Sequence, residues 1–173
     1  MPKRTLAVVT ALSLACALSS TAALSMRLTD LTKVDVSAFP TPDYTIKQAP
    51  DRLTIACVKC DGLVAIDVTI SPTMDGTEER IRNGETTAKT MLEICKKNAK
   101  ARGTECYNIR TANLKGAVGF VSDYKISDAM YGATYTIFQD NKLLMMRNIA
   151  GSRAEAKRLG GLAFEHVAPQ IVR

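Results

Sequence analysis

Alternating apolar and polar residues between Leu53 and Ile70 give the clearest structural pattern in the chain. Two such segments, RLTIACVKC and LVAIDVTI, flank Asp61-Gly62, a dipeptide that suits a two-residue hairpin turn. That turn would pair Cys57 with Ile66 and place Cys60 on the opposite face of the hairpin. We therefore expect an antiparallel hairpin whose buried face consists of Leu53, Ile55, Cys57, Val64, Ile66, Val68 and Ile70.

Helical spacing replaces this alternation after a polar segment, residues 71–84. From Glu85 to Gly103 the apolar residues recur on one helical face, and Gly103 is a suitable stop. That face consists of Ala88, Leu92, Cys95 and Ala99. A second helix is predicted from Ser152 to about Val167, because Ser152 and Glu155 have the spacing of a capping box. Gly160-Gly161 should weaken this helix by about 1 kcal/mol per glycine relative to alanine.

Strand patterns fill the interval between these helices, at residues 105–111, 116–126, 131–139 and 142–150. Asp140-Asn141 is a second tight turn, which places Ile137 opposite Leu144. Two antiparallel hairpins, each followed by a helix that packs on the sheet, predict an α+β fold with a mostly antiparallel sheet. The LLMM run at 143–146 indicates a strand covered on both faces, with an exposed partner-binding surface as the alternative.

The first 25 residues have the pattern of a secretory signal peptide. Two basic residues, Lys3 and Arg4, precede an uncharged segment that begins with leucine, valine and alanine and continues with small residues. An uncleaved membrane anchor is one alternative, because the uncharged stretch is long enough to span a bilayer. A lipoprotein at Cys16 is another, although Ser13 stands where such signals usually have leucine.

This pattern divides the chain into three parts. Residues 1–25 are the predicted signal peptide, residues 26–50 a proline-containing extended arm with an edge strand at 44–46, and residues 51–173 a single α+β domain. The expected location is periplasmic or secreted, with no membrane span once the signal is cleaved.

Composition and charge narrow the class of function. Hydrophobic residues make up 46% and charged residues 23%, which are globular values. The single histidine, His166, excludes multi-histidine metal sites, and an aromatic content of 5% without tryptophan makes nucleic acid a poor partner. Without Lys3 and Arg4 the chain keeps 21 basic and 17 acidic residues. That excess favours an anionic envelope component as partner, with another exported protein as the alternative. We expect no metal and no cofactor.

Four cysteines remain after signal cleavage, an even number that indicates two disulfides in an exported protein. In a continuous strand, Cys57 and Cys60 would lie about 10 Å apart, and a disulfide requires about 4.4–6.8 Å between Cα atoms. Face parity places Cys57 and Cys95 on core faces, and Cys60 and Cys106 on the opposite faces. We therefore predict the pairs Cys57–Cys95 and Cys60–Cys106, with Cys57–Cys60 and Cys95–Cys106 as the alternative.

The candidate chemistry is sparse. Cys57 and Cys60 form a C-x-x-C motif, as in redox-active dithiols, but the helix that usually follows is missing. We predict a non-catalytic binding or accessory role in the cell envelope, with a periplasmic thiol–disulfide oxidoreductase that uses these two cysteines as the alternative. A candidate anion-binding site, whose alternative is a solvated helix end, consists of Lys96, Lys97, Lys100 and Arg102. His166 lacks an accompanying nucleophile motif and is predicted to pack at the edge of the last helix.

Overall fold

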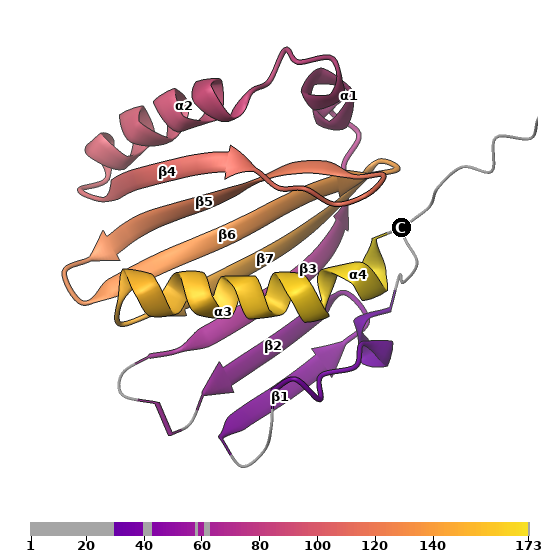
Figure 1. Cartoon of the computed structure of the whole chain (residues 1–173), viewed down its shortest axis with the longest axis vertical. Coiled ribbons are helices and arrows are strands. Elements are labelled where there is room, and N and C mark those ends of the chain that lie inside the picture. The colour runs from indigo at the N-terminus through magenta and orange to yellow at the C-terminus, as the bar shows by residue number, and fades with distance from the viewer. Residues whose placement is uncertain (1–29, 40–42, 58, 61–62, 173) are drawn as a thin grey trace, which may run out of the picture.

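A seven-stranded antiparallel sheet runs through the protein, with helices packed against it (Figure 1). The computed structural model describes residues 30–39, 43–57, 59–60 and 63–172. The predicted signal peptide, residues 1–25, lies outside the described residues. The strand order is β1-β2-β3-β7-β6-β5-β4, which confirms the predicted α+β class and its antiparallel sheet.

The strands are β1 (Tyr44–Ala49), β2 (Arg52–Cys57), β3 (Ala65–Pro72), β4 (Glu105–Thr111), β5 (Val118–Ser127), β6 (Met130–Gln139) and β7 (Lys142–Ala150). The helices are a short 3-10 helix η1 (Leu31–Lys33), α1 (Thr77–Arg82), α2 (Ala88–Ala101), α3 (Arg153–His166) and α4 (Ala168–Ile171). Each strand predicted between residues 105 and 150 is present, with ends that agree within two residues.

The first hairpin has its predicted buried face but not its predicted register. Ile55 pairs with Ile66, and the N–H of Cys57 donates to the Val64 carbonyl at 2.9 Å. A turn confined to Asp61-Gly62, which itself lies outside the described residues, would have paired Cys57 with Ile66. The displacement is two residues, the period of a strand, so the same side chains stay on the same face. The side chains buried there are Leu53, Ile55, Val64, Ile66 and Val68.

Both disulfides join cysteines close in sequence, and the predicted pairs Cys57–Cys95 and Cys60–Cys106 are wrong. The structure has Cys57–Cys60 and Cys95–Cys106, with Cα–Cα distances of 5.6 and 5.9 Å. β2 ends at Cys57, so Cys60 does not continue the strand. In the sheet, four strands lie between β2 and β4, and α2 packs on β4. Neighbouring strands are about 4.8 Å apart, so β2 and β4 are about 24 Å apart. This distance is too long for a disulfide between Cys57 and a cysteine of α2.

The second tight turn is as predicted. Asp140 and Asn141 both have positive φ angles, 52° and 58°, as a type I′ turn requires, and Ile137 pairs with Leu144. In the LLMM run, Leu144 and Met146 are fully buried on the face that α3 covers. Leu143 and Met145, on the other face, are only half-buried. β7 is therefore covered completely on one face only.

Helix α3 crosses the centre of the sheet over β6 and β7 (Figure 1). The Ser152 hydroxyl accepts from the Glu155 N–H at 3.2 Å, which confirms the predicted N-cap, but the Glu155 carboxylate binds Arg158 instead of completing a capping box. Gly160 has a packing role that the sequence did not reveal. A Cβ there would lie 3.0 Å from Tyr135 Cε2 and 3.1 Å from Asn148 Nδ2, so a larger residue would press on both side chains where α3 meets the sheet.

Helix α2 lies beside β4, the edge strand at the other end of the sheet from β1 (Figure 1). It begins three residues later than predicted, because the N–H groups of Glu85 and Thr86 both bond to the Arg80 carbonyl and belong to the end of α1. Its apolar face is the predicted one, although only Ala99 is buried. Leu92 and Cys95 are half-buried around a small cluster formed with β4 and β5.

The segment before β2 packs on the domain. Leu31, Val34 and Phe39 are buried in the main core, and the Phe39 and Tyr44 rings meet edge to face, with centroids 5.9 Å apart. β1 is an edge strand that includes the predicted residues 44–46. Among the described residues, no helix combines the length and the apolar character needed to cross a membrane.

Candidate functional site

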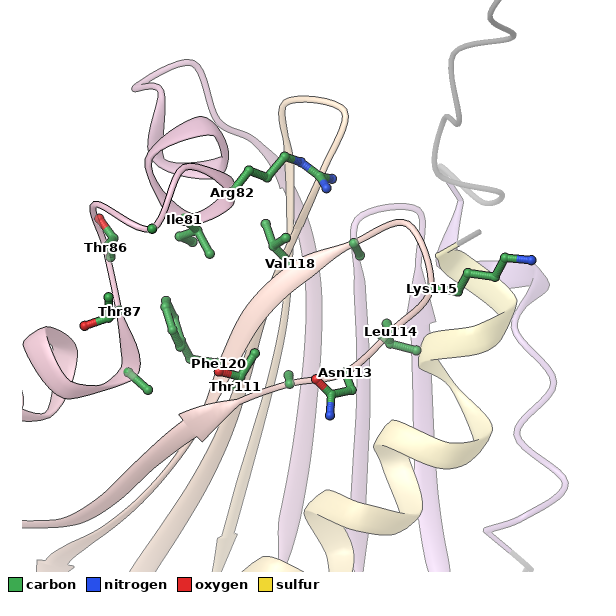
Figure 2. A pocket seen from close by; sticks show the side chains of 14 residues that line it. Ile81, Arg82, Thr86, Thr87, Thr111, Asn113, Leu114, Lys115, Val118 and Phe120 are labelled. Atoms are coloured by element: carbon green, nitrogen blue, oxygen red, sulfur yellow. The ribbon is translucent and has the colours of Figure 1, made fainter.

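A groove lies between two connections at one end of the sheet (Figure 2). One wall is the α1–α2 connection, residues 83–87, and the other is the β4–β5 connection, residues 112–117. The groove has a volume of about 660 Å³, against about 410, 270 and 210 Å³ for three smaller cavities. We refer to it as the α1–β5 groove.

Two side chains hold α1 in place above the groove. Arg82 donates to the Gly116 carbonyl at 2.8 Å and forms an ion pair with Glu78 at 2.7 Å. Glu78 in turn accepts from the N–H of Asn141, in the β6–β7 turn, at 3.1 Å. The short helix is thereby tied to two turns of the sheet, which fixes the width of the groove.

Local sequence determines where α1 begins and ends. The Asp75 carboxylate accepts from the N–H of Thr77 at the start of the helix. Hydrogen bonds from the Thr77 side chain, the Thr77 N–H and the Thr73 hydroxyl lower the pKa of Asp75 below its usual value. Gly84 follows the helix with a φ of +76°, a conformation that favours glycine. The chain then reverses, and Thr86 and Thr87 line the groove.

The groove has an apolar floor and a polar rim. Phe120, only 6% exposed, extends from β5 toward Ile81 of α1, with Val118 beside it (Figure 2). The polar lining side chains are Arg82, Thr86, Thr87, Thr111, Asn113 and Lys115. Both charged members of this set are basic, and in Figure 2 their charged ends point away from Phe120.

No protein-family model and no curated protein matches the sequence. The fold is similar to the solution structure of cyanobacterial PsbP (CyanoP) from Synechocystis sp. PCC 6803, with a TM-score of 0.51. The similarity covers 89% of this chain and 96% of that chain, at 12% sequence identity. At this identity the likeness concerns the fold alone.

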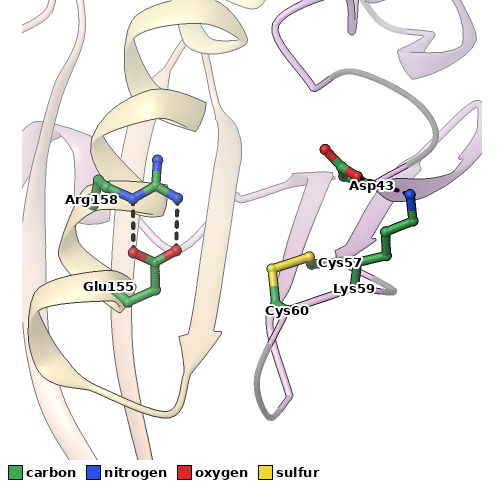
Figure 3. Close-up of a disulfide and its surroundings, with 6 residues drawn as sticks. All are labelled: Asp43, Cys57, Lys59, Cys60, Glu155 and Arg158. Carbon is green, nitrogen blue, oxygen red and sulfur yellow. Dashed lines mark hydrogen bonds and ion pairs between the residues drawn. A yellow bond between two sulfur atoms is a disulfide. The ribbon is translucent and has the colours of Figure 1, made fainter.

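The C-x-x-C motif is far from the groove, because four strands separate β2 from β4 in the sheet. Figure 3 shows its disulfide. Cys57 and Cys60 are half-buried against the edge of the main core. Between them, Lys59 is exposed and pairs with Asp43 at 3.4 Å. The structure thus contains the motif as a closed disulfide, and no described residue between it and β3 is helical.

The predicted basic site is spread along the end of α2. Its four members are all exposed, and none of them forms an ion pair with a described residue: Lys96, Lys97, Lys100 and Arg102. Arg102 alone lines a cavity, the one of about 270 Å³ that borders the Cys95–Cys106 disulfide. His166 was predicted to pack half-buried at the edge of the last helix, but it is exposed, as the last residue of α3. Among the described residues, no cluster of three or more histidine, cysteine, aspartate or glutamate side chains could hold a metal ion.

The α1–β5 groove has no signature in the sequence. Its lining comes from two stretches of the chain, residues 81–88 and 111–120, and most of its side chains are threonine, alanine and small apolar residues that carry no motif. The one available signal was Gly84, since a glycine after a short helical pattern marks a reversal of the chain.

Proposed function

We propose that this protein is an exported, disulfide-stabilised domain with a non-catalytic binding role in the cell envelope, and that the α1–β5 groove is its binding site. The observation that carries the proposal is the groove itself. Its volume of about 660 Å³ falls within the range of binding clefts, and it combines an apolar floor with a few polar groups at the rim.

Two further observations support this function. Two disulfides in one small domain are typical of proteins that fold in an oxidising compartment, either the periplasm or the extracellular space. The basic rim of the groove suits an acidic partner, which agrees with the positive charge of the chain after signal cleavage. The partner would be another exported protein or an anionic envelope component.

Export is tested by mass spectrometry of the protein isolated from the envelope or the medium. We expect a new N-terminus between Ala23 and Met26. A product that keeps Lys3 in the exported fraction would instead support the uncleaved anchor.

Binding at the groove is tested by photo-crosslinking in intact cells. The photoreactive amino acid p-benzoylphenylalanine replaces Asn113, which lines the groove, or Asn108, an exposed residue of β4 outside it. We expect a discrete adduct from position 113 and none from position 108. Equal adducts from both positions, or none from either, would contradict a binding role for the groove.

The closed Cys57–Cys60 disulfide favours a second candidate function, a periplasmic thiol–disulfide oxidoreductase. This enzyme would reduce or reshuffle disulfides in a standard insulin assay, and Cys57→Ala would abolish that activity. A binding domain would show no such activity and no free thiols when isolated. The anion-binding role of Lys96, Lys97, Lys100 and Arg102 stays a prediction, which titration with inorganic phosphate would test.

A further inference from the structure

We propose that the α1–β5 groove binds an extended, acidic segment of another exported protein by adding it as a strand to the free edge of β4. This inference rests on the binding role proposed for the groove and specifies the partner and the way it docks. Three observations carry it. The outer backbone edge of β4 is unpaired, the groove beside that edge has an apolar floor, and the charged side chains of its rim are all basic.

The backbone edge is the first observation. β4 is the last strand of the sheet, so its outer side has no neighbouring strand. The N–H of Ala112 donates inward to the Gly119 carbonyl at 2.9 Å. Because hydrogen-bonding groups alternate along an antiparallel strand, the N–H and C=O groups of Thr111 and Asn113 point outward. Within the described residues, no hydrogen bond joins these groups to α1 or α2.

This part of the edge also lies beyond the cover of α2. The helix runs beside β4, and Ala88, its first residue, lines the groove together with Thr111 (Figure 2). The chain before Ala88 turns away toward α1, which leaves the open space of the groove next to the free backbone groups. An unpaired strand edge in such a position is a template for another strand.

The floor supplies the contacts that an added strand needs for its side chains. Successive side chains of an extended segment point to opposite sides, so every second one would face the groove. Those side chains would meet Phe120, Val118 and Ile81, which come from β5 and α1. The inward positions of the partner segment should therefore be apolar, and the outward positions are free to be polar.

Charge complementarity selects an acidic segment. Arg82 and Lys115 are the charged residues in the lining, and the lining contains no acid. Arg82 is already paired with Glu78, whereas Lys115 is exposed and forms no ion pair with a described residue. The first turn of α2 has no acidic residue either, so the positive end of its dipole adds to the same field. A carboxylate beside Lys115 would therefore be favoured, and a basic segment disfavoured.

The test begins with selection from a phage-displayed library of random dodecapeptides on the exported protein. We expect the selected peptides to alternate apolar and polar residues and to be enriched in aspartate or glutamate. A selection without enrichment over an empty support, or with enrichment in basic peptides, would overturn the proposal.

The selected peptide is then used, as a synthetic acetylated amide, to test the docking geometry. Hydrogen exchange of the unmodified protein, measured by NMR, should slow by at least tenfold at the amides of Thr111 and Asn113 when the peptide is added. Thr111→Pro, which removes the outward N–H, should lower the affinity by at least tenfold while circular dichroism shows an unchanged fold. Because the exchange measurement needs no variant, it decides the question even if this variant does not fold.

Charge is tested by a matched pair of substitutions. Lys115→Glu should weaken binding of the acidic peptide several-fold, whereas Lys47→Glu, the same change at the opposite edge of the sheet, should leave it unchanged. Equal effects at both positions would mean that only net charge matters and would contradict docking at the groove. If a groove crosslink forms at position 113 but the amides of Thr111 and Asn113 stay unprotected, the binding role survives and strand addition fails.

Discussion

Helices α2 and α3 each have 14 residues, but they bury very different surfaces against the same sheet. α3 buries Ala156, Leu159, Gly160 and Ala163 against the central strands, and stacking of Phe164 on Tyr135 extends the contact. α2 buries only Ala99, and its cluster with β4 and β5 has four buried members. A disulfide joins α2 to β4, whereas none joins α3 to the sheet within the described residues. Apolar packing holds the central helix, and a covalent bond compensates for weak packing at the edge.

The largest test of this difference is a pair of leucine truncations. Leu159→Ala should destabilise the protein by about 2–5 kcal/mol, because this side chain of α3 is fully buried in the main core. Leu92→Ala on α2 should cost clearly less, because Leu92 is only half-buried and a cavity there opens to solvent. Urea denaturation of both variants measures the two costs, and equal values would contradict the comparison.

Removal of each disulfide is the second test. Cys95→Ala with Cys106→Ala should cost about 3 kcal/mol by loop entropy, and Cys57→Ala with Cys60→Ala about 2 kcal/mol, because the loops span 11 and 3 residues. Hydrogen exchange separates the two further. Loss of Cys95–Cys106 should expose the amides of α2 selectively, while those of α3 stay protected. Uniform loss of protection would show that packing alone does not hold α3.

The two adjacent glycines of α3 form a matched pair for the third test. Gly160→Ala should destabilise by about 1–3 kcal/mol, because its Cβ meets Tyr135 and Asn148. Gly161→Ala has nothing within 4 Å of its Cβ, so it should stabilise the helix by up to about 1 kcal/mol. Thermal denaturation measures both signs. Two stabilising substitutions would mean that α3 does not pack as closely as described.

The smallest expected effect concerns a surface ion pair of α3. Hydrogen bonds from Arg158 lower the pKa of the Glu155 carboxyl below its ordinary value of 4.5. A lowered pKa in the folded state stabilises the protein above the unfolded-state pKa, and this contribution is lost as the pH falls through the folded-state pKa. Arg158→Gln should cost about 0.3–0.5 kcal/mol near pH 7, and this cost should disappear as acid protonates the Glu155 carboxyl. Lys97→Gln, on α2, should show no such pH-dependent difference in denaturation experiments.

The strands and their buried faces could be predicted because a period of two residues marks them directly. The buried face between Leu53 and Ile70 was predicted correctly although the pairing register of β2 and β3 was not, because the register error was two residues, the period of a strand. The disulfide pairing could not be obtained in this way, because it depends on which strands become neighbours. β3 pairs with β7 across 70 or more residues of chain, and that pairing places Cys57 far from Cys95.

The groove could not be predicted from the sequence either, because it also depends on contacts between distant parts of the chain. It exists because Arg82 and Glu78 attach α1 to turns that lie far along the chain, at Gly116 and Asn141. No periodicity encodes those two contacts. The Gly160-Gly161 pair is a comparable case, because helix propensity treats the two residues alike and only the packed structure distinguishes them.

The Cys95–Cys106 disulfide also determines what proteolysis does to this protein. It closes a covalent ring that contains the four exposed basic residues at the end of α2: Lys96, Lys97, Lys100 and Arg102. A trypsin-like protease that cuts after any of them opens the ring without releasing a fragment. The nicked chain stays one molecule, with β4 still attached to the remaining turns of α2, and it separates into two pieces only after reduction. In a compartment that contains proteases and no reductant, this surface segment can be cleaved without dissociation of the domain.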